Sequence, residues 1–92
     1  MTEWKRGQVV RATRGREAGR LLCVVGTAQT HVLVCDGRER PLSRPKAKNP
    51  KHLEPLARLL SAEEMRSDRA LKQTLKKISE AKANVEAGHD RN

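Results

Sequence analysis

The chain has 92 residues, and its 20 Lys and Arg against 11 Asp and Glu give a formal net charge of +9. This length corresponds to one small domain, or to one small domain with an appendage, and leaves little room for a deep pocket that excludes water. The size therefore disfavours an enzyme. Trp4 is the only aromatic residue, which excludes a platform on which single-stranded bases would stack.

The positive charge is concentrated in the first two thirds of the chain. Residues 1–60 carry thirteen Lys and Arg against five Asp and Glu, whereas residues 61–92 carry seven against six. A basic surface of this kind is typical of proteins that bind nucleic acid through its phosphates. An acidic membrane surface or an acidic protein is the alternative partner. A charge that served solubility alone would not need this asymmetry.

Three short apolar and β-branched runs predict strands at residues 7–13, 21–25 and 30–35. In the first strand we expect Val10 and Ala12 to point inward, with Trp4 folded over the core as a lid. The second run is apolar on both faces, which predicts a central position in the sheet.

A hairpin is expected after the third strand, because an Asp-Gly pair favours a tight type I′ turn. Asp36 and Gly37 would form this turn, and residues 38–43 a short fourth strand. Residues 44–51 contain two prolines and are expected to form an extended, exposed basic loop. Residues 52–56 alternate in polarity and predict a closing strand. Several short strands with tight turns indicate a small barrel or sandwich.

From Ser61 onward, the apolar residues follow a helical spacing instead of a strand pattern. Ser61 and Glu64 fit a capping box, which predicts a helix over residues 62–86 with a break near residues 67–68 and Gly88 as its C-cap. Its narrow apolar stripe consists of Leu71, Leu75, Ile78 and Val85. This stripe would pack on the barrel, pair with another helix, or leave the helix frayed.

The most distinctive segment is the turn between the first two strands. It contains Arg14, Gly15, Arg16, Gly19 and Arg20 within seven residues. Glycines allow positive φ and a close approach of backbone to ligand, while guanidinium groups bind phosphate through two parallel hydrogen bonds. The plainer alternative is that the glycines only satisfy the turn and the arginines are solvated. The turn is not a P-loop, because no GxxxxGK[ST] pattern occurs.

The segment GQVVRATRGREAGRLLCVV, residues 7–25, resembles the KOW motif of ribosomal proteins and transcription elongation factors. Gly19 stands where that family keeps its nearly fixed glycine. The following CDGRERPLSRPKAKNPKHL, residues 35–53, is similar to the second half of the large-subunit ribosomal protein family written in words as L-fourteen-e. The resemblance, which includes short bacterial KOW proteins, covers residues 7–53 and does not extend over residues 61–92.

This resemblance implies an SH3-like barrel. Together with the strand and helix patterns it predicts a mainly β fold: a barrel of five strands in residues 1–60, followed by a helix and short tail in residues 61–92. It also implies RNA binding, usually to ribosomal RNA of the large subunit. Charge and matched position together predict the RNA-binding residues Arg14, Gly15, Arg16, Gly19, Arg20, Arg38, Arg40, Arg44, Lys46, Lys48, Asn49, Lys51 and His52.

No pattern in the sequence predicts catalysis, a cofactor or a metal site. Cys23 and Cys35 lack zinc-ligand spacing and are expected to be reduced core residues. His31, His52 and His89 are scattered, and the acidic residues of the helix have the pattern of a solvated face. The N-terminal residues lack the apolar stretch of a secretory signal and no apolar run is long enough to cross a membrane, so a cytoplasmic location is expected.

A protein-interaction module is the rival interpretation. In that case the helix would dock on a ribosomal protein, a polymerase or another partner through Leu71, Leu75, Ile78 and Val85. Both interpretations can hold together, with the barrel on RNA and the helix on protein. A nuclease that used the scattered carboxylates is disfavoured.

Overall fold

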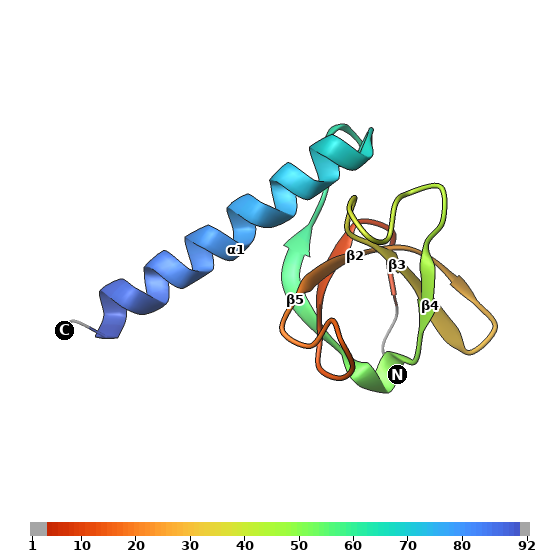
Figure 1. The fold of residues 1–92 in the computed structure, drawn as a ribbon, viewed down its shortest axis with the longest axis horizontal. Helices are drawn as coiled ribbons and strands as arrows, with labels where there is room; N and C mark the ends of the chain where they lie inside the picture. The colour runs from red at the N-terminus through yellow and green to blue at the C-terminus, as the bar shows by residue number, and fades with distance from the viewer. Residues whose placement is uncertain (1–3, 91–92) are drawn as a thin grey trace.

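A computed structural model describes residues 4–90, with side chains as far as Ala81. Five strands form one antiparallel sheet in the order β4-β3-β2-β1-β5, which curls into an open barrel, and one long helix follows (Figure 1). The strands and the helix are β1 (Gln8–Ala12), β2 (Leu21–Ala28), β3 (His31–Cys35), β4 (Lys46–Lys48), β5 (Leu53–Leu59) and α1 (Asp68–Asp90). The predicted mainly β fold with a C-terminal helix is therefore confirmed, and its shape is compatible with an SH3-like barrel.

The sheet is buried on both faces, because adjacent residues of β1 point into two separate cores. Val10 and Ala12 face the inner core, as predicted, whereas Val9 faces an outer core. The inner core fills the barrel, and it contains Val10, Ala12, Leu22, Val24, Val32, Val34 and Leu53. Trp4 is half-buried against this inner core, in the position expected of a lid.

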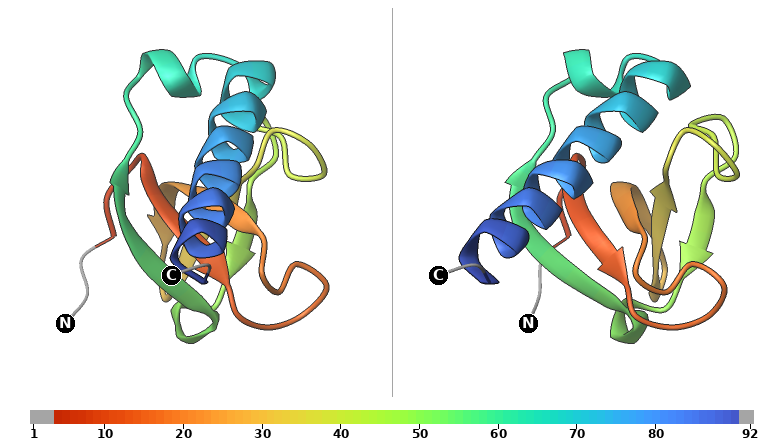
Figure 2. Two further views of the ribbon diagram at one scale, coloured as in Figure 1. Left: turned by 90° about the vertical axis from the view of Figure 1, so that its left-hand side faces the viewer. Right: turned by 60° about the vertical axis from the view of Figure 1, so that its left-hand side comes forward.

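The outer core lies between the sheet and α1. Leu71 and Leu75 of α1 pack there with Val9 of β1 and the two cysteines. Figure 2 shows α1 running along the outside of the curled sheet, and the helix contacts β2. The helix and the barrel thus share a core.

Cys23 and Cys35 lie opposite each other on β2 and β3 and are both free, fully buried thiols. Burial raises the pKa of Cys23 to about 11 and that of Cys35 to about 12. Both thiols therefore stay protonated at neutral pH, which agrees with their interpretation as core residues. The strand that carries Cys23, β2, is central in the sheet, as its two apolar faces predict.

The prediction of a strand at residues 38–43 is wrong. Residues 36–45 form a loop, and the fourth strand is β4, within the segment that was expected to be an exposed loop. The Asp-Gly pair does not make a two-residue hairpin, because the Asp36 carboxylate accepts hydrogen bonds from the backbone N–H groups of Arg38 (2.8 Å) and Arg40 (3.0 Å). These bonds hold a wider loop, so the chain joins the sheet only at Lys46.

The helix begins later than predicted. The capping box forms as expected, with Ser61 N–H donating to Glu64 (2.9 Å) and Glu64 N–H donating to the Ser61 hydroxyl (3.2 Å). These bonds lie at the short 3₁₀ turn η2 (Glu63–Met65), and not at the start of α1. The break expected near residues 67–68 is where α1 starts, and the Ser67 hydroxyl accepts the Ala70 N–H there. Gly88 is not the C-cap, because the helix continues to Asp90.

The described part of the apolar stripe of α1 packs on the barrel, the first of the three arrangements that the sequence allows. Leu71 is fully buried and Leu75 is 6% exposed, while Ile78 is half-buried against the same core. The side chain of Val85 lies outside the part that the structure describes. The leucines are thus occupied within the chain itself.

Candidate nucleic-acid interface

The turn between β1 and β2, residues 13–20, adopts the conformation that its glycines allow. Gly15 and Gly19 have φ of +83° and +89°. Gly19 N–H donates to Ala12 C=O (2.7 Å) and Arg20 N–H donates to Glu17 C=O (2.8 Å), which closes the turn over the end of β1. We call residues 13–20 the Gly-Arg turn.

Two arginines of the Gly-Arg turn project into solvent. Arg14 and Arg16 are exposed, and neither pairs with an acidic side chain among the described residues. Arg20 is also exposed and lies 3.3 Å from Glu39, an acid that is itself 63% exposed. A pair of this kind adds little stability and can be exchanged for a phosphate.

The acidic residue of the turn, Glu17, points inward and is only 3% exposed. Its carboxylate contacts three cations: Arg40 Nε (3.2 Å), Lys48 Nζ (3.2 Å) and Lys46 Nζ (3.4 Å). Burial raises the pKa of Glu17, but the hydrogen bonds of Lys48 and Arg40 and the charges of Lys48 and Lys46 outweigh this effect and lower the pKa to about 2. We call these four residues the Glu17 cluster.

The Glu17 cluster changes the role of three predicted RNA-binding residues. Lys48 is 8% exposed, so its ammonium group serves the interior and not a ligand. Arg40 and Lys46 are half-buried and share the same carboxylate. One carboxylate balances only one of the three positive charges, so the Glu17 cluster keeps a net positive charge. Its contacts join the Gly-Arg turn to β4 and to the loop before it.

The loop at residues 36–45 presents the next group of cations. Arg38 and Arg44 are exposed and have no acidic partner among the described side chains. Both border a shallow hollow of about 560 Å³, and the predicted residues Arg40 and Lys46 also reach this hollow. The structure therefore brings these four predicted residues together.

The segment at residues 49–52 is mainly structural. The Asn49 side chain accepts the Lys51 N–H (2.9 Å) and so caps the short 3₁₀ turn η1 (Pro50–His52). His52 is a half-buried residue. Its backbone carbonyl accepts the Thr13 N–H (2.9 Å), which joins η1 to the Gly-Arg turn. Lys51 is exposed, but like Arg14 and Arg16 it lines neither of the two hollows described in this section.

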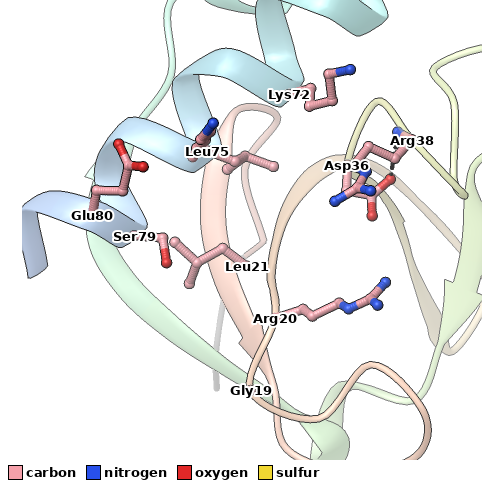
Figure 3. A pocket seen from close by; sticks show the side chains of 10 residues that line it. Gly19, Arg20, Leu21, Asp36, Arg38, Lys72, Leu75, Ser79 and Glu80 are labelled. Carbon is pink, nitrogen blue, oxygen red and sulfur yellow. Dashed lines mark hydrogen bonds between the residues drawn. The ribbon is translucent and has the colours of Figure 1, made fainter. Parts of the chain in front are cut away.

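A second hollow, of about 430 Å³, lies between the barrel and α1 (Figure 3). Gly19, Arg20 and Leu21 form one wall, and Asp36 and Arg38 another. The third wall is α1, which contributes Lys72, Leu75, Lys76, Ser79 and Glu80. We call this hollow the helix cleft.

Lys72 and Lys76 were not among the predicted site residues. They follow Leu71 and Leu75 directly and lie one helical turn apart, so the sequence places them along the border of the apolar stripe. That spacing was a usable signal. What the sequence did not provide was the position of the helix against the barrel.

Other kinds of site find no support in the residues described. Within them no group of three His, Cys, Asp or Glu side chains could hold a metal ion. His31 is exposed beside the Thr30 hydroxyl, 3.1 Å away, and has no carboxylate partner in the described part of the chain. None of the helices in that part is long and apolar enough to cross a membrane.

Comparison with known proteins adds no family to this description. No protein-family model matches the chain, and no curated protein matches it.

Proposed function

We propose that this protein binds structured RNA, with ribosomal RNA of the large subunit as the leading ligand. The observation that carries the proposal is a set of exposed cations on three hydrogen-bonded segments: the Gly-Arg turn, the loop at residues 36–45 and η1. These six cations are Arg14, Arg16, Arg20, Arg38, Arg44 and Lys51. The resemblance of residues 7–53 to KOW proteins supports the same ligand.

The mode of binding follows from the chemistry of these side chains. Guanidinium groups on rigid turns bind phosphate oxygens at low entropic cost. With Trp4 as the only aromatic side chain, and that ring half-buried, stacking on splayed bases contributes little. Recognition therefore rests on the RNA backbone and its shape. About six phosphate contacts imply a log–log dependence of affinity on salt with a slope of roughly −4 to −5.

The direct test compares two variants that each lose three arginines. R14Q/R16Q/R44Q removes exposed cations of the proposed interface, whereas R58Q/R66Q/R69Q removes three from β5, from the segment after η2 and from the start of α1. Binding of a fluorescently labelled ribosomal RNA fragment is measured by anisotropy at several salt concentrations. The first variant is expected to bind roughly thirty- to a hundredfold more weakly and to lose about half of the salt slope. Equal losses in both variants would mean that net charge alone drives binding.

The identity of the RNA is tested in cell lysate. Tagged protein is sedimented through a sucrose gradient at low and high salt, and the RNA crosslinked to it is sequenced. Co-migration with the large ribosomal subunit, lost at high salt, with crosslinks in one ribosomal RNA helix, is the expected result. A protein that stays at the top of the gradient in both conditions would contradict the ribosomal ligand and would direct attention to other RNAs or to a polymerase.

A further inference from the structure

The helix cleft brings together cations from three segments that are far apart in the sequence. Arg20 comes from the Gly-Arg turn, Arg38 from the loop at residues 36–45, and Lys72 from α1 (Figure 3). Lys76 of α1 lines the same cleft. All four are exposed. Neither lysine forms an ion pair with a described side chain, so their ammonium groups are available to a ligand.

The two carboxylates of the cleft do not cancel this charge. Asp36 is 7% exposed, and its carboxylate already accepts the N–H groups of Arg38 and Arg40. Glu80 is exposed at the distal end of the cleft. Glu39, the exposed partner of Arg20, is a third acid beside the cleft. Four cations against three acids still leave a local excess of positive charge that attracts a polyanion.

The cleft is held in shape from both sides. On the helix side, Leu71 and Leu75 are anchored in the outer core. The Asp68 carboxylate accepts the Leu42 N–H (2.7 Å), which joins the first turn of α1 to the loop at residues 36–45. Gly37 of that loop packs directly on the backbone of Asp68 and Lys72. The backbone segments that carry these cations are therefore held in place before any ligand arrives, which lowers the entropic cost of binding.

The spacing of the lysines suits a phosphate chain. Residues four apart on a helix have Cβ atoms roughly 5–6 Å apart on the same face. Lys72 and Lys76 thus offer two cations in a row along the cleft, opposite the guanidinium groups of Arg20 and Arg38. Leu75 between them provides an apolar floor that is already buried.

We propose that the helix cleft binds the sugar–phosphate backbone of the RNA, so that α1 is one wall of the RNA site. Lys72 and Lys76 contact phosphates from the helix side, while Arg20 and Arg38 contact them from the barrel side. This inference rests on the proposed RNA binding, and it assigns α1 to the RNA and not to a protein partner.

The test uses two full-length double variants of α1 with the same net charge. K72Q/K76Q removes the cleft lysines, and R69Q/K77Q removes two exposed cations that do not line the cleft. In RNA-binding titrations, K72Q/K76Q is expected to lower affinity roughly tenfold and to reduce the salt slope by about 1.5 to 2, while the control changes affinity less than about twofold. K72R/K76R should restore binding. Equal thermal midpoints of all variants exclude misfolding.

The possible results separate this inference from the proposed function. If the wild type binds RNA and both double variants bind as tightly as it does, the cleft is unoccupied and the inference is wrong while RNA binding stands. If both variants lose affinity equally, general charge explains the loss and the inference is also wrong. A wild type without RNA affinity would overturn both proposals.

A second measurement needs no variant. Lysines of the wild-type protein are acetylated with and without a saturating RNA fragment, and each site is quantified by mass spectrometry. Lys72 and Lys76 are expected to be protected at least several-fold more than Lys77, which lies on the same helix outside the cleft. Equal reactivity of the three lysines in the presence of RNA would contradict the inference.

Discussion

The carboxylate of Glu17 contacts three cations, of which Lys48 is buried and Arg40 and Lys46 are half-buried. From the sequence alone, a glutamate in an exposed basic turn is expected to be solvated. Its burial depends on Lys48, 31 positions further along the chain, and this pairing is not visible in local patterns. Three predicted RNA-binding residues, Arg40, Lys46 and Lys48, therefore have a partner within the chain that the sequence did not reveal.

Replacing Glu17 by glutamine is expected to lower the free energy of unfolding at pH 7 by about 3 kcal/mol, the value of a pKa lowered from 4.5 to about 2. Because the folded pKa lies below the unfolded one, this contribution is present above about pH 4.5 and is lost as the pH falls towards 2. The difference between wild type and E17Q should thus shrink in acid. Urea unfolding at pH 7, 4 and 2.5 measures it.

The matched control for this prediction is E39Q. Glu39 also pairs with an arginine of the same region but is 63% exposed, so its loss should cost less than about 0.5 kcal/mol. Equal destabilisation by E17Q and E39Q would show that burial of the Glu17 cluster contributes nothing.

At the scale of elements, the strands with apolar residues were predictable and the strand without them was not. β1, β2, β3 and β5 follow runs of valine, leucine and cysteine that alternate between two cores. β4 reads Lys-Ala-Lys, and its inward residue is Lys48, which finds its partner in Glu17 and not in an apolar core. A strand held by a buried ion cluster gives no hydrophobic period.

The connection between β3 and α1 depended on tertiary contacts in the same way. Asp36 and Gly37 have the composition of a tight hairpin turn, but Asp36 caps the following loop. Gly37 has φ of +80°, and the first turn of α1 lies where a Cβ atom of this residue would be. The helix itself was predictable from its apolar stripe. Its start and the surface it covers depend on Asp68 and on the outer core, so the helix cleft could not be foreseen.

Gly37→Ala is expected to destabilise the protein by about 2–4 kcal/mol. The added Cβ would clash with the Asp68 carbonyl and meet the Lys72 amide nitrogen at 3.1 Å, besides the cost of positive φ. Gly15→Ala is the control, because φ is +83° there but no atom lies within 4 Å of a Cβ. It should cost only about 1 kcal/mol. The thermal unfolding midpoints of the two variants measure this difference. Equal midpoints would mean that α1 does not press on the loop.

For the molecule as a whole, the sheet joins two cores that use opposite faces of the same strands. The inner core is built from the barrel strands, whereas the outer core needs Leu60, Met65, Leu71 and Leu75 from the C-terminal segment. The expected division at residue 60 is thus a change of secondary structure and not a boundary between independent cores. The free energy of unfolding of a small domain is only about 5–15 kcal/mol, so the fold cannot do without the outer core.

Truncation gives the corresponding prediction. A chain that ends at Ala81 keeps every described contact of the outer core and should unfold cooperatively, within a few degrees of the full chain. A chain that ends at Leu60 loses Met65, Leu71 and Leu75, worth about 1.5–3 kcal/mol each, and should not fold stably. Circular dichroism during heating distinguishes the two. A cooperative transition in the shorter chain would show that the barrel folds without the helix.

The position of Trp4 has a practical consequence for such experiments. As the only aromatic side chain, it is the sole source of near-ultraviolet fluorescence, and it rests against the inner core. The far-ultraviolet helical signal comes instead mainly from α1, on the other side of the sheet. A single unlabelled sample therefore reports the two sides of the sheet through two optical channels, and coincident transitions would mean that they melt as one cooperative unit.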